Sequence, residues 1–157
     1  MESRMKSYIP SSARATIENT AVRAGCTLGS ADRALPALVV LGAQKAGTTS
    51  FYHYLSQHPE TVTPSRKEVH YFDNNYRRGL NWYRAHFCKQ SDLGRGRHFT
   101  FEANPYYLFH PAVPKHVAAK LTDAKFVVML RNPIKRAYSH YWHEKDLAMN
   151  RFHSTKP

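Results

Sequence analysis

A glycine-flanked loop carries the residues of this sequence that are best suited to chemistry on an anion. The loop runs from Gly42 to Ser50 and holds one lysine and three neighbouring hydroxyl residues. An apolar segment, residues 38–41, precedes it, and a helix-like segment follows. A strand, a glycine loop and a helix form a cradle for phosphate, because loop amides and the helix N-terminus face the anion. The pattern therefore predicts phosphate binding, with a tight structural turn as the alternative.

The position of the lysine separates this loop from the phosphate loop of kinases. In a Walker A motif the lysine directly follows the second glycine. Here Thr48 follows Gly47, and the lysine lies earlier, at Lys45. A kinase is further disfavoured because the sequence shows no clear acidic residue for magnesium. The loop is therefore expected to hold a phosphate group in a different setting.

Predicted strands and helices alternate along the chain. We expect strands at 37–42, 98–103 and 125–131, the last of them buried, and helices at 47–57, 80–87, 111–121 and 133–149. This order indicates an α/β fold, a parallel sheet flanked by helices with a P-loop-like nucleotide-binding core. Ligands of such sheets bind beyond the carboxyl ends of the strands. Lys45 and Arg131 both follow apolar strands and should therefore meet at that edge.

Length and charge limit the organisation and the partners of the chain. Its 157 residues suffice for one domain with a real core, and its formal net charge is +12. We predict a basic N-terminal extension at 1–33, read as a variable arm or a transit peptide, followed by a domain at 34–157. The charge implies an anionic partner such as a nucleotide, an acidic glycan, a nucleic acid or a membrane surface, unless it is only a solvated basic face.

Three segments resemble, in the expected order, parts of sulfotransferases that use 3′-phosphoadenosine 5′-phosphosulfate (PAPS). Residues 42–50 resemble the loop that binds the 5′-phosphosulfate, and residues 131–139 resemble the motif that binds the 3′-phosphate. Residues 67–73 are similar to an active-site segment of the heparan-sulfate glucosamine sulfotransferases and related bacterial enzymes. The resemblance covers residues 37–148. Because domains of that family continue well beyond the last motif, we expect the chain to be incomplete at its C-terminus.

The resemblance implies a role for each matched position. Glu68 would be the general base for the acceptor, with Lys45 and His70 as further catalytic residues. Arg131 and Ser139 would bind the 3′-phosphate. The loop positions that would contact the 5′-phosphate and the sulfuryl group are Gln44, Lys45, Ala46, Gly47, Thr48, Thr49 and Ser50. The residues expected beside the acceptor are Lys67, His70 and Asp73.

Elementary chemistry agrees with these roles. Sulfuryl transfer, like phosphoryl transfer, mainly needs in-line placement and stabilisation of charge. Lys45 beside the bridging oxygen would favour departure of the anionic bisphosphate. A positioned carboxylate such as Glu68 can remove the proton of an acceptor hydroxyl, although Glu68 can also be read as a mere surface partner of Lys67. No metal is required, and the ten histidines form no clear ligand set.

The sequence thus favours a sulfotransferase that transfers the sulfuryl group from PAPS to a hydroxyl or amine, expected to belong to a carbohydrate. The alternative is a non-catalytic fragment that binds PAPS, its product PAP, or a sulfated glycan. Nucleic-acid binding is not expected, because the basic residues form no continuous stripe. The longest apolar run, 34–43, is too short to span a membrane. We expect a cytoplasmic enzyme, or a Golgi one if a longer precursor carries an anchor.

The aromatic residues Trp82 and Tyr83 have two readings. They lie in a segment rich in aromatic side chains, 80–87, that reads as a helix. Such residues pack in cores more often than they serve as a platform for a sugar, because each buries a large apolar area. We therefore expect both in the core.

The turn that follows the second strand, 102–107, sits where the family has a substrate-side turn, with Ala103 where glycan-modifying relatives often have a lysine.

Overall fold

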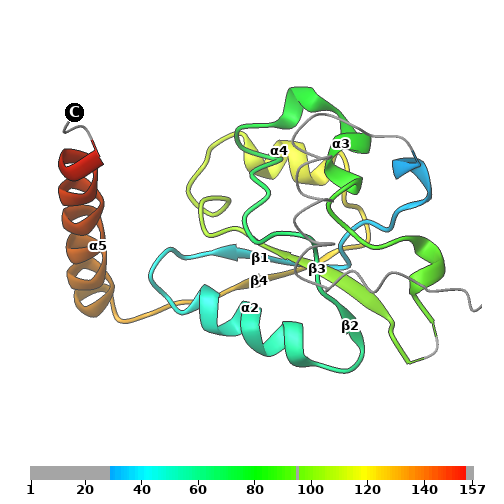
Figure 1. Ribbon diagram of the computed structural model, residues 1–157, viewed down its shortest axis with the longest axis horizontal. Coiled ribbons are helices and arrows are strands. Elements are labelled where there is room, and N and C mark those ends of the chain that lie inside the picture. The colour runs from blue at the N-terminus through cyan, green and yellow to red at the C-terminus, as the bar shows by residue number, and fades with distance from the viewer. Residues whose placement is uncertain (1–28, 95, 155–157) are drawn as a thin grey trace, which may run out of the picture.

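The computed structural model describes residues 29–94 and 96–154 (Figure 1). Most of the predicted N-terminal extension, residues 1–28, therefore lies outside the described residues. The short helix η1, Ser30–Asp32, leads from there into the domain.

A parallel sheet of four strands forms the centre of the fold. The strands are β1 (Leu38–Gly42), β2 (Thr61–Val62), β3 (Phe99–Ala103) and β4 (Lys125–Val128). Their order is β2-β3-β1-β4, and each neighbouring pair is parallel. The predicted parallel α/β sheet is thereby confirmed, and β2 is a short additional strand. Val39 and Val40 of the central strand β1 are fully buried.

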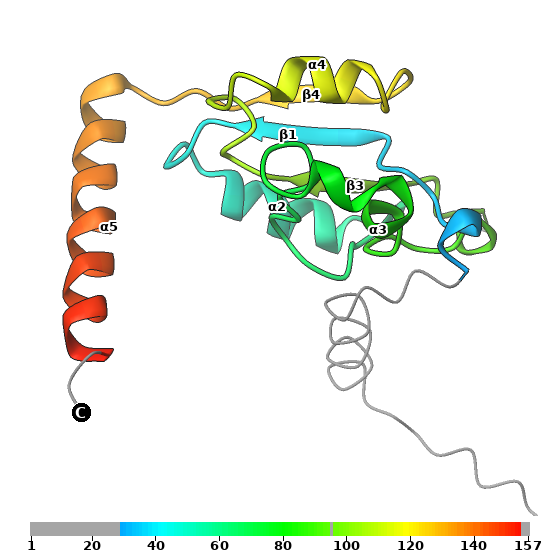
Figure 2. The same cartoon turned by 90° about the horizontal axis from the view of Figure 1, so that it is seen from above.

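Helices cover both faces of the sheet. The helices of the described chain after η1 are α2 (Thr48–Gln57), α3 (Leu80–Arg84), α4 (Val113–Ala118) and α5 (Pro133–Ser154), with the short 3-10 helices η2 (Tyr76–Arg78) and η3 (Gln90–Asp92). Figure 1 shows α2 below the sheet and α3 and α4 above it. In both ribbon views α5 stands apart from these layers (Figure 2). The sheet and its covering helices therefore form the body of the fold.

The main core lies on the face of the sheet that α3 and α4 cover, and it is rich in aromatic rings. Its largest members include Tyr71, Phe72, Tyr83 and Tyr107. Tyr71 stacks on Tyr83 with ring centroids 4.5 Å apart. Trp82 and Tyr83 are both buried, so their predicted place in the core is confirmed. Because Tyr71 and Phe72 come from an irregular segment, the core also anchors the chain that follows β2.

The last strand differs from its prediction in extent and in burial. A buried strand was expected over 125–131, but β4 ends at Val128 and most of its residues are exposed. Phe126 and Val128 are exposed, and Leu130 beyond them is 81% exposed. The reason is position: β4 is an edge strand that pairs with β1 alone, and the described residues leave much of it uncovered.

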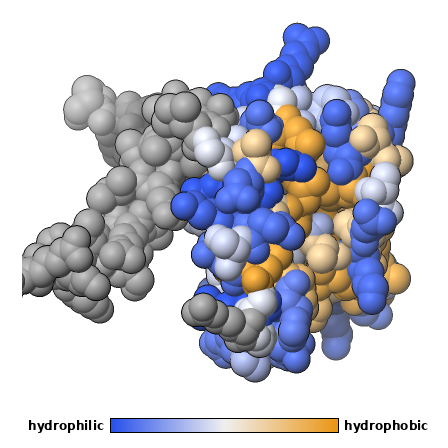
Figure 3. Space-filling view, turned by 90° about the vertical axis from the view of Figure 1, so that its right-hand side faces the viewer, coloured by the Kyte–Doolittle hydropathy of each residue, from blue (hydrophilic) through white to orange (hydrophobic). Residues whose placement is uncertain are grey.

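Apolar side chains are also exposed away from this edge strand. Ile134 and Tyr138 of α5 are exposed, as are Leu108 and Phe109 of the turn after β3. Viewed from the amino ends of the strands, the surface shows an apolar area beside hydrophilic side chains (Figure 3). The surface of the described residues is therefore apolar in several places although the chain is strongly basic.

Gly42 lets a turn pack directly against the end of β1. Its φ angle is 143°, and an added Cβ would lie 2.8 Å from the carbonyl oxygen of Pro105 and 3.0 Å from Cβ of Leu108. The turn is held there by two backbone hydrogen bonds, in which Asn104 donates to Val40 at 3.0 Å and Leu108 donates to Leu41 at 2.8 Å. No side chain at position 42 is compatible with this approach.

We expect Gly42→Ala to lower the free energy of unfolding by about 2–4 kcal/mol, because it combines a disfavoured φ with overpacking against backbone. Gly29→Ala is the matched control: Gly29 lies in the left-handed α region, with a φ of 74° and a ψ of 9°, but no atom lies within 4 Å of an added Cβ. Its loss should be about 1 kcal/mol. Urea denaturation of both variants measures the difference. Equal losses would show that the turn does not press on β1.

Candidate active site

The predicted phosphate loop connects β1 to α2 at the carboxyl end of the central strand. Gly47 adopts a left-handed conformation with a φ of 97°, and α2 begins directly after it at Thr48. Gly47 has no side chain with which to cap the helix, so the first amides of α2 remain available to an anion. Lys45 lies within the loop, also with a positive φ, of 65°. The loop therefore has the local geometry expected of an anion cradle.

One cavity of about 410 Å³ is lined by residues from all three of the segments that resemble the family. The phosphate loop and α2 contribute Gln44, Lys45, Gly47, Thr48 and Thr49, the second segment Lys67 and Glu68, and the third Arg131 and Ser139. The side chain of Arg131 crosses to the loop, where Nη1 donates a hydrogen bond of 3.0 Å to the carbonyl oxygen of Lys45. Parts of the chain 86 residues apart therefore meet here.

Four of the residues predicted from the sequence do not line this cavity. Ala46 is half-buried in the loop, and Ser50 is exposed in the first turn of α2. His70 lines an adjacent cavity of about 290 Å³, and Asp73 lies behind His70. The predicted site is thus divided between two neighbouring cavities.

The larger cavity also has lining residues that the sequence did not mark as site residues: Pro105, Tyr106 and His143. Pro105 and Tyr106 lie on the turn that follows β3, and His143 lies on α5. A signal for the turn was present, because it leaves the carboxyl end of a parallel strand next to β1. For His143, one helical turn after Ser139, the signal is helical spacing alone.

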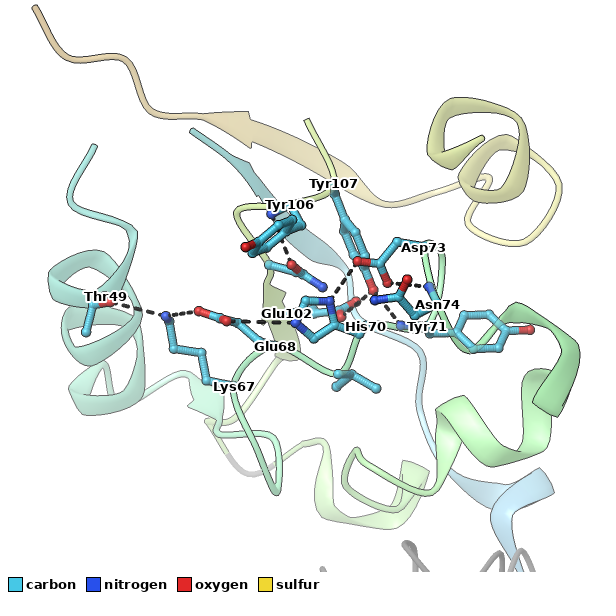
Figure 4. A network of polar contacts seen from close by, with 12 residues as sticks. Thr49, Lys67, Glu68, His70, Tyr71, Asp73, Asn74, Glu102, Tyr106 and Tyr107 are labelled. Atoms are coloured by element: carbon cyan, nitrogen blue, oxygen red, sulfur yellow. Dashed lines mark hydrogen bonds and ion pairs between the residues drawn. The ribbon is translucent and has the colours of Figure 1, made fainter. Parts of the chain in front are cut away.

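A row of polar side chains leads from the phosphate loop across the second segment (Figure 4). Lys67 Nζ donates a hydrogen bond of 3.1 Å to Thr49 Oγ1 and forms an ion pair with Glu68. The other carboxylate oxygen of Glu68 lies 3.9 Å from His70 Nε2. On its far side, His70 Nδ1 lies 2.7 Å from Asp73 Oδ2. Each charge in the row therefore has a neighbour of opposite sign.

The contact between His70 and Asp73 shifts both groups toward their charged forms. The hydrogen bond to Asp73 raises the pKa of His70, and this outweighs burial and the nearby Arg66, which lower it. Burial by itself would raise the pKa of Asp73, but its hydrogen bonds with His70 and the amide of Asn74 bring it below the usual value. His70 consequently carries positive charge to a higher pH than an isolated histidine.

The backbone of the second segment is unusual at two of the positions predicted to be functional. Glu68 and His70 have φ angles of 59° and 57°, although neither is glycine. Residues with side chains rarely adopt this left-handed conformation. Each such residue costs on the order of 1 kcal/mol or more and persists only where the surrounding structure holds it. The placement of the two side chains therefore depends on neighbouring parts of the fold.

Two kinds of feature are not found within 29–94 and 96–154. No three His, Cys, Asp or Glu residues come together there as a group able to hold a metal ion. None of the helices in that part of the chain is both long and apolar enough to cross a membrane.

Several known proteins are similar to this chain in sequence, and one solved structure is similar in fold. The family model described as "Sulfotransferase domain" matches residues 35–156. The membrane-associated sulfotransferase kil1 of Dictyostelium discoideum is 36% identical over 107 residues, which is 68% of this chain and 22% of that protein. The bifunctional heparan sulfate N-deacetylase/N-sulfotransferase of Drosophila melanogaster is 41% identical over 131 residues, 71% of this chain and 12% of that protein.

A solved structure extends the likeness to three dimensions. The crystal structure of a sulfotransferase from Alicyclobacillus acidocaldarius aligns with a TM-score of 0.60 at 35% identity, covering 70% of this chain and 50% of that one. The chain thus spans about half the length of this solved relative and less than a quarter of the two curated ones. The family model and these relatives agree with one another, and the chain belongs to the sulfotransferase domain family.

Proposed function

We propose that the chain binds PAPS and transfers its sulfuryl group to a hydroxyl or amine of a carbohydrate. The observation that carries the proposal is the single cavity that the phosphate loop, Glu68, Arg131 and Ser139 all line. A donor with phosphate groups at its 3′ and 5′ positions needs hydrogen-bond donors from two separate places, and this cavity has them. A carbohydrate acceptor is supported by relatives that are named heparan sulfate N-sulfotransferases.

The residues of the cavity fit the two ends of such a donor. The free amides at the start of α2, with Lys45, would hold the 5′-phosphate and the sulfuryl group. Arg131 and Ser139 would hold the 3′-phosphate. Although Arg131 already donates one bond to the carbonyl of Lys45, a guanidinium has five N–H groups, so donors remain for a phosphate.

Glu68 and Lys67 would have different roles in the transfer of the sulfuryl group. The acceptor oxygen forms a bond to sulfur while the bond from sulfur to the bridging phosphate oxygen breaks, and Glu68 takes the acceptor proton. Lys67 touches both Glu68 and Thr49, so it stands between the base and the phosphate loop. An incoming anionic group would compete with Glu68 for Lys67, which would leave the carboxylate free to accept the proton.

The adjacent cavity suggests what kind of acceptor fits. It is lined by Arg66, Val69, His70, Asn74, Asn75, Arg78, Trp82 and His86, a set with two arginines and no carboxylate. Since His70 borders this cavity and also approaches Glu68, an acceptor held there would reach the base. We therefore propose an acceptor that carries negative charge near the reacting group, as in an acidic carbohydrate.

Glu68→Gln should reduce the transfer of labelled sulfate from PAPS to a glycan panel by about 10²–10⁴-fold, the usual contribution of a positioned base. PAP affinity by calorimetry should be nearly unchanged, because the amide keeps the shape of the side chain. Loss of PAP binding would make Glu68 structural. PAP binding by the unsubstituted chain without any transfer would favour the non-catalytic alternative, in which Glu68 only pairs with Lys67.

Arg131→Ala should weaken the binding of PAP by about 10–100-fold, since a charge-assisted hydrogen bond contributes about 1.5–3 kcal/mol. The affinity for adenosine 5′-phosphosulfate, which lacks the 3′-phosphate, should change little. Arg97→Ala is the control, because Arg97 is exposed at the amino end of β3 and does not line the site. Calorimetry with both nucleotides decides, and an equal loss for the two would contradict contact with the 3′-phosphate.

Arg66→Gln should raise the KM for an acidic glycan, with a smaller dependence of KM on salt, and leave the KM for a neutral glycan unchanged. Arg77→Gln provides the control, because Arg77 is exposed and lies outside both cavities. Steady-state kinetics at low and high salt measure the effect. A similar rise of KM for the neutral glycan would argue against an anion subsite in the adjacent cavity.

A further inference from the structure

Glu102, at the end of β3, is a buried acidic residue that the proposed chemistry does not use. It is 1% exposed and lines neither of the two cavities. Its carboxyl group accepts hydrogen bonds from the hydroxyl groups of Tyr83 and Tyr107, the latter at 2.7 Å. Burial raises the pKa of Glu102 to about 7 even though both tyrosines act to lower it. A buried carboxyl group is costly, so its presence calls for a role in the structure.

The hydroxyl group of Tyr107 links this carboxyl group to the candidate site. While it donates to Glu102, it accepts hydrogen bonds from the backbone amides of Tyr71 at 3.0 Å and Phe72 at 3.3 Å. These amides belong to the irregular segment 68–73, which no strand or helix contains. Figure 4 shows Tyr107 reaching this segment beside His70 and Asp73. The side chain of Tyr107 therefore supplies these backbone amides with the acceptor that a neighbouring strand would otherwise provide.

The same end of β3 also holds the start of the segment. The amide of Glu68 donates a hydrogen bond of 3.2 Å to the carbonyl oxygen of Ala103, the residue after Glu102. Glu68 and His70, with their positive φ angles, lie between this bond and the amides bound to Tyr107. Since such backbone persists only when its surroundings fix it, these two attachments help to fix the segment, together with the amide of Asn75, which donates a hydrogen bond of 2.9 Å to the carbonyl oxygen of His70.

We propose that Glu102 and Tyr107 are positioning residues: Glu102 orients the hydroxyl group of Tyr107, which holds the segment 68–73 so that Glu68 faces the acceptor and His70 stays paired with Asp73. The direction of the hydroxyl hydrogen is the central point. When it points at Glu102, the lone pairs of the oxygen face the two amides. The consequence for sulfate transfer rests on the proposed function, whereas the consequence for His70 does not.

Two tyrosine variants test the proposal with a matched pair. Tyr107→Phe and Tyr83→Phe each remove one hydroxyl group from Glu102 and keep a buried ring, but only Tyr107 touches the amides of the segment. Titration of the His70 imidazole by NMR should show its pKa lowered toward the ordinary value in Tyr107→Phe, because the contact with Asp73 loosens. The pKa of His70 should stay unchanged in Tyr83→Phe. An identical pKa in both variants would overturn the proposal.

Kinetics provide the second measurement. The kcat for sulfate transfer should fall by about 10–100-fold in Tyr107→Phe, the range expected when a catalytic group is slightly misplaced, with a smaller fall in Tyr83→Phe. The affinity for PAP should be unchanged in both. Equal falls in kcat would show that Tyr107 acts only through the core. If the unsubstituted chain transfers no sulfate while the His70 shift appears, the proposed function fails and the positioning role stands.

Glu102→Gln supplies a further variant in case Tyr107→Phe does not fold. A glutamine has the same shape but only one acceptor oxygen for the two tyrosines. Amide hydrogen exchange at Tyr71 and Phe72 should then be faster than in Tyr83→Phe, and the pKa of His70 should fall as well. Unchanged exchange at both amides, together with an unchanged pKa, would contradict the role of Glu102.

Discussion

Parallel pairing of β1 with β3 on one side and β4 on the other is the constraint on which the candidate site depends. Val39 of β1 stands opposite Glu102 of β3 and Phe126 of β4, so the three strands end at the same edge. The segments that leave this edge are the phosphate loop, the turn 104–108 and the stretch that contains Arg131. Residues of all three line one cavity because the hydrogen-bond ladders fix where each strand stops.

Close packing at this edge of the sheet brings several charged side chains together in one cavity. The turn after β3 packs directly against Gly42. The loop that follows Gly42 places Lys45 in the lining of the same cavity as Arg131. The cavity lining holds three Lys or Arg residues and a single carboxylate, that of Glu68. A site with this balance attracts anions, and its one carboxylate forms an ion pair with Lys67. Fold geometry thus brings the cationic side chains and the proposed base to one place.

Sequence reasoning predicted the parts of this site that depend on local patterns. The apolar run before Gly42, the loop and Pro133 at the start of α5 each carry a signal in the sequence itself. It failed where position in the sheet decides: β4 reads as a buried strand, yet it lies at an edge. The positive φ angles of Glu68 and His70 had no signal at all, since glycine is the residue that normally marks them. The segment that carries them is held in part by contacts with Ala103 and Tyr107, which are distant in the sequence.

The two sides of the candidate site are held in different ways. On the side proposed for the acceptor, Glu68 and His70 belong to a segment whose next residues, Tyr71 and Phe72, are buried among aromatic rings. On the side proposed for the 3′-phosphate, Ser139 and His143 lie on α5, a helix that stands apart and exposes Ile134 and Tyr138. Few buried apolar contacts mean low local stability, so α5 depends more than the acceptor side on other partners for its position. A ligand that bridges Arg131, Ser139 and the phosphate loop would supply such a partner, and the proposed nucleotide would in that way be coupled to the placement of α5.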